Sequence, residues 1–187
     1  MKDAESVHIR LLEEGDPPRI AAAFENIGWN KPAGRYRRYL QEQVAGTRTC
    51  FVTSVDGQFA GYVTVNWRPT YVGFADLNIP EIQDLNVLPI FRRKGIASRL
   101  LDRAETEVAR YSSIVGIGVG LPPGYSAAQR LYVKRGYIPD GRGITFRDQF
   151  VDEGAQVRLD DDLVMHFTKR LRAADDTPPN DRCDELR

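Results

Sequence analysis

The stretch NVLPIFRRKGIASRLL, residues 86–101, joins an apolar strand pattern to an amphipathic helix through a basic turn. Its Arg92, Arg93 and Lys94 stand directly before Gly95, where the helix begins. Three neighbouring cations repel one another, and the positive end of the helix dipole disfavours them further. The arrangement therefore predicts an anionic group at this helix N-terminus, where the first N–H groups have no acceptor within the helix.

The residues around the turn indicate what kind of anion would fit. Gly95 lets a bulky ligand approach the backbone closely, and the small Ala97 suits the same purpose. Three positive charges suit a pyrophosphate better than a single phosphate. The alternative is an ordinary basic turn before a helix, and the loop by itself does not decide between the two. The sequence contains neither G-x-x-x-x-G-K-[ST] nor a G-x-G-x-x-G that follows a strand, which argues against two other phosphate motifs.

Composition and charge narrow the class of protein. The 187 residues suit one domain, and a formal net charge of zero argues against a general nucleic-acid binder. The opening MKDAESVHIR lacks an apolar run, so we expect no signal peptide, and IVGIGVGL is too short to span a bilayer. Cys50 and Cys183 make neither a disulfide framework nor a metal cluster. We expect a cytoplasmic protein, with a domain over residues 1–172 and a disordered tail over residues 173–187.

Helix and strand periodicities alternate along the domain. Strands are predicted within residues 7–12, 48–67 (two strands joined at Asp56-Gly57), 80–89, 112–121 and 162–171. Helices are predicted within residues 17–27 (capped by Asp16), 32–46, 95–111 and 125–136 (closed by Gly136). The apolar side of the second helix carries Tyr36, Tyr39, Leu40 and Val44, and that of the third carries Ile96, Leu100, Leu101, Ala104 and Val108. Residues 138–161 form a Gly-rich and charged excursion. The pattern predicts an α/β fold with helices packed on a mixed sheet.

Two motifs in this order resemble those of one enzyme family. Residues 85–101, LNVLPIFRRKGIASRLL, are similar to the acetyl-CoA-binding motif of the GNAT acetyltransferase superfamily, R/Q-x-x-G-x-G/A, through Arg92, Gly95 and Ala97. Residues 126–141, SAAQRLYVKRGYIPDG, resemble the second motif, N-x-x-A-x-x-L-Y-x-K-x-G-F/Y. The matching residues there are Ala128, Leu131, Tyr132, Lys134, Gly136 and Tyr137. Tyr125 is a departure from this motif, because the family usually has an Asn there that helps to hold the cofactor.

The resemblance implies a GNAT fold, with splayed strands in a mixed central sheet flanked by helices, and acetyl-CoA as cosubstrate. The strand over residues 80–89 would splay from the strand over residues 112–121. The pantothenate arm of CoA would then pair with the exposed edge as an added strand does. The implied cofactor-binding residues are Leu85, Asn86, Val87, Arg92, Arg93, Lys94, Gly95, Ile96, Ala97, Ser98 and, at the departure from the motif, Tyr125.

Tyr132 is the predicted general acid for the leaving thiolate. A phenol with a pKa near 10 can protonate a thiolate of pKa about 8.5 only with help from geometry. The alternative is a core position, because Tyr125, Ala128, Leu131 and Tyr132 form one stripe of the helix. The motif match favours the catalytic role.

Glu81 is the predicted general base, since several family members use a carboxylate at this strand position. Strand alternation would place it on one face with Gln83, Leu85 and Val87, and would place Asp84, the weaker candidate, on the other. The alternative for Glu81 is a solvated strand end.

Other polar and aromatic residues carry weaker signals. His8 and His166 lack the partners of a metal site, so we interpret both as structural. The run 160–162, Asp-Asp-Asp, suits a solvated turn, and less strongly a feature that attracts a cationic acceptor. In this family the region of Trp29, Asn30 and Tyr36 shapes the acceptor cleft, although aromatic residues there also suit a core.

The main functional hypothesis is an N-acetyltransferase that moves the acetyl group of acetyl-CoA to a primary amine. The alternative is a non-catalytic acyl-CoA-binding sensor module of the same fold, and a nucleotide-binding enzyme is disfavoured because the Walker pattern is missing. We expect an amine-bearing small molecule or peptide as partner, with neither nucleic acid nor membrane, and leave room for a homodimer.

Overall fold

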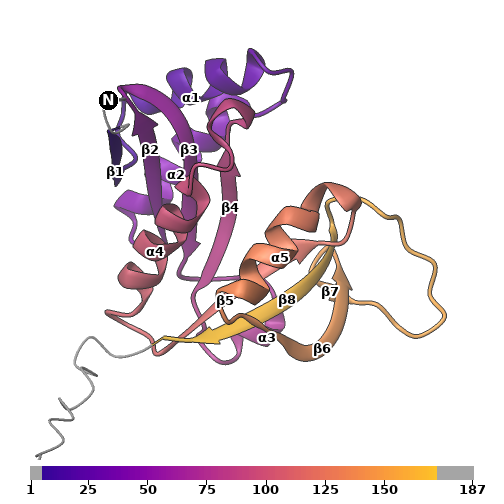
Figure 1. Cartoon of the computed structure of the whole chain (residues 1–187). Helices are drawn as coiled ribbons and strands as arrows, with labels where there is room; N and C mark the ends of the chain where they lie inside the picture. The colour runs from indigo at the N-terminus through magenta and orange to yellow at the C-terminus, as the bar shows by residue number, and fades with distance from the viewer. Residues whose placement is uncertain (1–5, 172–187) are drawn as a thin grey trace, which may run out of the picture.

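The computed structural model describes residues 6–171, so the predicted tail and Cys183 lie outside the described residues. The strands are β1 (Val7–Leu11), β2 (Arg48–Val55), β3 (Gln58–Asn66), β4 (Glu81–Val87), β5 (Ile114–Gly120), β6 (Ile138–Phe146), β7 (Gln149–Phe150) and β8 (Leu163–Arg170) (Figure 1). The α-helices are α1 (Asp16–Glu25), α2 (Ala33–Val44), α3 (Val72–Ala75), α4 (Ile96–Val108) and α5 (Ser126–Lys134). Short 3₁₀ helices at Pro89–Phe91 and Pro123–Tyr125 precede α4 and α5.

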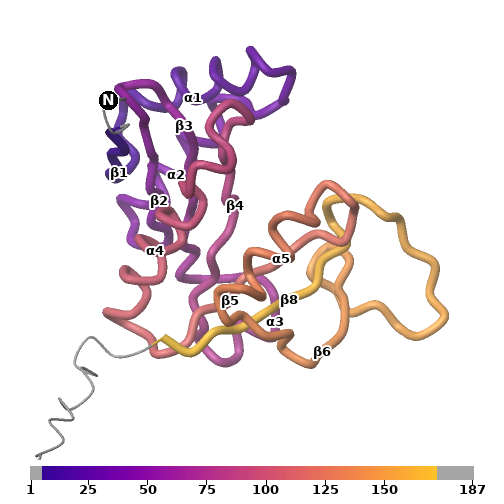
Figure 2. The backbone as a smooth tube through the Cα atoms, in the orientation of Figure 1, coloured from indigo at the N-terminus to yellow at the C-terminus, as the bar shows by residue number. Residues whose placement is uncertain are grey.

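The strands form one mixed sheet in the order β1-β2-β3-β4-β5-β8-β6-β7. Its parallel pair is β4 with β5, which are matched only at Glu81 with Gly116 and at Ile82 with Ile117. Beyond these positions the two strands diverge (Figure 1), while β4 stays paired with β3 as far as Val87. Figure 2 shows β1–β4 on one side of this divergence and β5–β8 on the other. The α/β class and the predicted splay are therefore confirmed.

Local patterns account for the elements around the opening. The predicted stripe of α4 is buried, and its five residues belong to the main hydrophobic core. The hairpin between β2 and β3 turns at Asp56 and Gly57, whose φ angles are 49° and 79°. Two positive φ values are what a tight two-residue hairpin turn requires, so this prediction is also confirmed.

Two helix details differ from the sequence-based expectation. Gly15, and not Asp16, is the N-cap of α1. Asp16 instead accepts hydrogen bonds of 2.6 and 2.7 Å from the guanidinium of Arg10. These charge-assisted bonds stabilise the buried carboxylate better than a capping position in solvent would. Val44 is 86% exposed, because the inward position at the end of α2 belongs to Gln43. The Gln43 amide donates to the carbonyl of Leu12 and accepts from the N–H of Cys50.

Residues 138–161 contain β6 and β7, which the sequence patterns did not predict. β6 pairs with β8 through a register shift between Pro139 and Ile144. Gly141 and Gly143 within it have φ angles of 81° and 87°. A strand interrupted in this way loses the alternation by which strands are found in sequences.

A buried acidic residue fixes α5 against α4. Glu105 of α4 accepts hydrogen bonds from the hydroxyl of Tyr137 at 3.0 Å and from Nζ of Lys169 in β8 at 2.6 Å. The guanidinium of Arg135, at the end of α5, adds an ion pair of 2.9 Å. These contacts set the position of the helix that carries Tyr132.

Candidate active site

The basic turn links β4 to α4 in the geometry expected of an anion site. Gly95 is the N-cap of the thirteen-residue helix α4 and has a φ of 77°, in the left-handed region. A Cβ on Gly95 would meet no atom within 4 Å, so the space over this backbone is open. The first N–H groups of α4 have no acceptor in the helix. Gly95 thus combines a conformation that favours glycine with a free approach for a ligand.

Arg92 connects this turn with the segment between α1 and α2. Its Nε donates to the carbonyl of Val87 at 3.1 Å, and its guanidinium lies 5.4 Å from the ring centroid of Trp29. The Trp29 ring in turn stacks on Phe24 at 5.7 Å. Trp29, which is expected to shape the acceptor cleft, therefore lies against the basic turn over residues 92–95. We call this turn, which is predicted to bind acetyl-CoA, the donor loop. The side chains of Arg93 and Lys94 are exposed at the same turn.

Strand β4 carries a bulge where it pairs with β3. Thr64 of β3 pairs with Gln83, but Tyr62 pairs with Asn86, so β4 has one extra residue between these points. Asp84 in the bulge has a φ of 52°. Beyond the bulge, where Gly61 pairs with Val87, a Cβ on Gly61 would clash with the carbonyl oxygen of Asn86, so only glycine allows this close approach. The sequence patterns did not single out Gly61, because its requirement comes from a neighbouring strand.

The bulge makes the expected alternation along β4 wrong. Register partners share a face, so Gln83 and Asn86 lie on the face of Thr64 and Tyr62, and Val87 lies on the other. Asp84 is also turned toward α2, where its carboxylate accepts a hydrogen bond from the hydroxyl of Tyr39. Asp84 therefore lies on the same side of the sheet as Glu81, and not on the opposite face as expected.

Glu81 is a buried carboxylate, only 5% exposed, so a solvated strand end is excluded. Gln83 donates a hydrogen bond of 2.7 Å from Nε2 to Oε2 of Glu81. Burial raises the pKa of Glu81 to about 8; the hydrogen bond from Gln83 opposes this rise, Asp148 adds to it and Arg48 opposes it. The carboxyl thus exchanges its proton in the neutral range, where a general base is most effective.

Tyr132 lies in α5 and is 5% exposed, with its ring 5.9 Å from that of Tyr137. Burial raises the pKa of its phenol above the ordinary value, so the hydroxyl keeps its proton at neutral pH. Tyr132 therefore keeps a proton to donate, but it is a weaker acid than a free phenol, and it also belongs to the core. The catalytic role of Tyr132 stays a prediction.

Three glycines of β5 leave room for rings on one face of the sheet. A Cβ on Gly116 would strike the ring of Phe74. One on Gly118 would touch Val164 and His166. One on Gly120 would lie 2.7 Å from the ring of Tyr125. Tyr125, in place of the family's Asn, therefore covers the end of β5. The alternating glycines of GIGVG were the available signal for this face, but they indicated only a strand.

The two histidines lie in different surroundings. His166 is buried and stacks on Tyr71 at 3.6 Å, while His8 is exposed in β1. Within residues 6–171, no group of three or more His, Cys, Asp or Glu side chains is placed to hold a metal ion. The acidic run forms a turn in which the N–H of Asp162 donates to Oδ1 of Asp160 at 3.0 Å.

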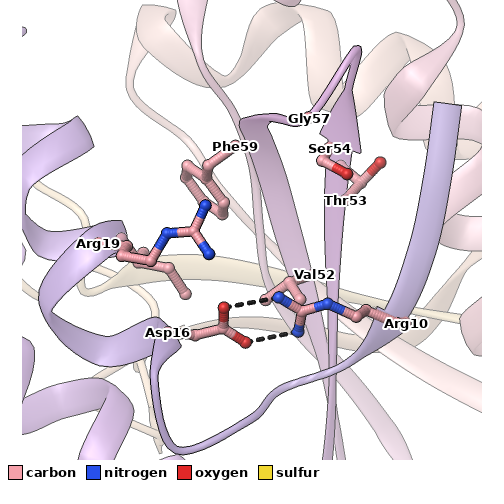
Figure 3. Close-up of a pocket in the computed structure, with 9 residues that line it drawn as sticks. Arg10, Asp16, Arg19, Val52, Thr53, Ser54, Gly57 and Phe59 are labelled. Atoms are coloured by element: carbon pink, nitrogen blue, oxygen red, sulfur yellow. Dashed lines mark hydrogen bonds and ion pairs between the residues drawn. The ribbon is translucent and has the colours of Figure 1, made fainter. Parts of the chain in front are cut away.

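Two hollows lie near the N-terminal helices. One of about 140 Å³ is lined by residues that include Arg10, Asp16, Arg19 and Phe59, and the Arg10–Asp16 pair occupies one side of it (Figure 3). No predicted site residue lines it, so it is not the candidate site. A more open hollow of about 530 Å³ includes Trp29 and Lys31, beside the donor loop.

Comparisons with known proteins agree with this geometry. The sequence model of the Acetyltransferase (GNAT) family matches residues 14–137, and no curated protein matches the chain. Among solved structures, yncA from Salmonella typhimurium, determined with its cofactor acetyl-CoA, is 18% identical with a TM-score of 0.64, covering 94% of this chain and 98% of its own. The ribosomal-protein-S18-alanine N-acetyltransferase from Escherichia coli is 15% identical with a TM-score of 0.64, covering 92% and 99%. An N-acetyltransferase from Staphylococcus aureus Mu50 is 17% identical with a TM-score of 0.66, covering 89% and 99%.

At these identities the solved structures establish the fold alone, whereas the family match spans most of the chain. No helix among residues 6–171 is long and apolar enough to cross a membrane. The splayed strands, the glycine turn at the start of α4 and the family match lead to one conclusion. The chain belongs to the GNAT family of acetyltransferases, which use acetyl-CoA as cosubstrate.

Proposed function

We propose that this protein transfers the acetyl group of acetyl-CoA to a primary amine. The observation that carries the proposal is that one strand, β4, combines an unpaired edge beside the glycine turn with a buried carboxylate, Glu81. The edge suits an extended donor, and the carboxylate suits proton removal from the acceptor. Both lie on the same element, so their separation is fixed.

The residues present fit acetyl-CoA. The turn at Gly95 offers backbone N–H groups and the exposed cations Arg93 and Lys94 to a pyrophosphate. Beyond Ile82, the edge of β4 that faces β5 has no pairing with that strand, so its N–H and C=O groups can pair with an extended amide chain. Leu85, Asn86 and Val87 would supply those groups. The bound thioester would supply the acetyl group.

Glu81 is the proposed base that removes a proton from the acceptor amine. A lysine-like amine with a pKa near 10.4 requires about 4.6 kcal/mol to become neutral at pH 7, whereas an α-amino group of pKa about 8 requires about 1.4 kcal/mol. A carboxylate whose pKa is about 8 accepts such a proton far more readily than a solvated one. Glu81 would take the proton, directly or through a water, and Tyr132 would protonate the leaving sulfur.

A CoA-release assay on a panel of amines tests this function. Wild-type protein should release CoA with at least one amine, and Glu81→Gln should lose most of the kcat/KM while still binding acetyl-CoA. A protein that binds acetyl-CoA and acetylates no amine would instead be the non-catalytic sensor. The absence of acetyl-CoA binding would overturn both readings of the site.

A further inference from the structure

The segment between α1 and α2 places one lysine on the aromatic core. Nζ of Lys31 lies 5.5 Å from the ring centroid of Phe24 and 5.9 Å from that of Tyr62. The N–H of Lys31 donates to the carbonyl of Trp29 at 3.0 Å, which folds the segment back on itself. The side chain is half-buried, unlike those of Lys94 and Lys134, which are exposed. Its amine is thus held over ring faces and away from bulk water.

Two contacts fix this amine beside the proposed donor site. Tyr62, whose ring lies under Lys31, is the register partner of Asn86. The Tyr62 hydroxyl accepts a hydrogen bond of 3.3 Å from the side-chain amide of Asn86. Asn86 lies on the edge of β4 where the arm of acetyl-CoA is proposed to bind. Two residues before Lys31, Trp29 contacts Arg92 of the donor loop. The segment is therefore attached both to the loop and to the edge.

The burial of Lys31, and not the charges around it, favours an amine that can react. Burial lowers its pKa, and Arg35 lowers it further, while Asp84 and Asp161 oppose the shift. Asp84 comes from the β4 bulge, and Asp161 from the turn before β8. A lowered pKa leaves more of the amine neutral at neutral pH than in an exposed lysine, and only the neutral form attacks a thioester.

We propose that Lys31 is a self-acetylation site, which accepts the acetyl group from acetyl-CoA bound to the same molecule. The proposal rests on the proposed function, because the same donor site would serve both acceptors. The Lys31 ammonium first loses one proton to a nearby carboxylate or to water. Neutral Nζ then attacks the thioester carbonyl carbon, the N–C bond forms and the C–S bond breaks. Sulfur leaves with the bond's electron pair and is protonated, and Nζ loses its second proton, so the products are Nε-acetyl-Lys31 and CoA.

The experiment incubates the full chain with acetyl-CoA and no added amine, and follows acetylation by peptide mass spectrometry. Trypsin cleaves after Arg19 and Arg35, so the peptide 20–35 contains Lys31 as its single lysine. Exposed Lys134 reports the background of direct chemical acetylation. Because an intramolecular acceptor has a large effective concentration, Lys31 should react at least about tenfold faster than Lys134. The fraction modified per unit time should not change when the protein is diluted.

Matched variants complete the test. Lys31→Arg removes the acceptor amine, so it should abolish the modified peptide. Because the variant keeps the positive charge, it should still bind acetyl-CoA. Trp29→Ala, which removes the contact with Arg92, should slow the reaction of Lys31 without changing that of Lys134. Equal rates at the two lysines, or a rate proportional to protein concentration, would overturn self-acetylation. If the protein acetylates free amines and Lys31 stays unmodified, the inference fails and the proposed function stands. If acetyl-CoA does not bind, both fail.

Discussion

The side-chain amide of Gln83 donates its hydrogen bond to Glu81 in a fixed orientation. The amide oxygen of Gln83 accepts hydrogen bonds from Arg48 at 3.1 Å and from Asn66 at 3.4 Å. A flipped amide would turn its NH₂ group toward these two donors, so only one orientation satisfies all groups. Gln83 is thus a positioning residue that directs a donor at the proposed base.

Removing this donor should shift the titration of Glu81. In Gln83→Leu, the ionised carboxylate loses a hydrogen bond, so its pKa should rise above the present value of about 8. The acidic limb of the pH profile of kcat/KM should move to higher pH by the same amount. Carbon NMR of labelled glutamate follows Glu81 directly, with its signal identified by its loss in Glu81→Gln. The charged and titratable groups facing Glu81, which are Asp148, Arg48 and Tyr71, are unchanged, so an unmoved titration would refute the role of Gln83.

Replacing Glu81 should make the protein more stable at alkaline pH. The pKa of Glu81 is raised from 4.5 to about 8, so the folded state binds a proton that the unfolded state has released between these values. The stability that the protonated carboxyl contributes is present below pH 4.5 and is lost as the pH rises through 8. Glu81→Gln, which is always neutral, should therefore gain up to roughly 4 kcal/mol over wild type at pH 9 relative to pH 4.5.

Urea unfolding of both proteins at several pH values measures this difference. The matched control is Glu25→Gln at the exposed end of α1, which should show no comparable pH-dependent gain. A constant difference between Glu81→Gln and wild type from pH 4.5 to 9 would show that the carboxyl is not held neutral by burial.

Gly95→Val should abolish acetyl-CoA binding and leave the fold in place. A Cβ-branched residue at a φ of 77° is strained by roughly 1–2 kcal/mol, and it covers the open backbone of the anion site. Gly46 has a φ of 72° and equally open surroundings at the end of α2, so Gly46→Val is a matched control for the strain. At a hundred times its Kd, acetyl-CoA should stabilise wild type and Gly46→Val by about 2.7 kcal/mol in thermal unfolding. A normal ligand shift in Gly95→Val would exclude this turn as the pyrophosphate site.

Tyr132→Phe should lower kcat by roughly ten- to a thousandfold, because it removes the proton donor and keeps the ring. Binding of acetyl-CoA should change little. Tyr137→Phe is the control: this neighbouring hydroxyl donates to Glu105, so its loss should reduce stability without a comparable loss of kcat. Steady-state kinetics and unfolding of both variants separate the two effects. Full activity in Tyr132→Phe would leave Tyr132 as a core residue.

Much of the fold around the donor turn could be predicted from local patterns. The α4 stripe and the Asp56-Gly57 hairpin depend on periodicity and turn chemistry within a few residues, and both are as expected. The boundary between strand β4 and helix α4 could be predicted for the same reason. In contrast, β6 is interrupted by a bulge near two left-handed glycines, so its local pattern gives no strand signal.

The sequence by itself determined the order of the elements other than α3, β6 and β7, together with the glycine turn at α4 and the residues available for chemistry. The tertiary structure alone decided how those residues are presented. The bulge at Asp84 follows from the register between β3 and β4, and the burial of Glu81 follows from neighbours distant in sequence. The same holds for Lys31, whose amine rests on rings from α1 and β3. Proton affinity depends on the dielectric and charges that surround a group in space, which periodicity along the chain does not encode.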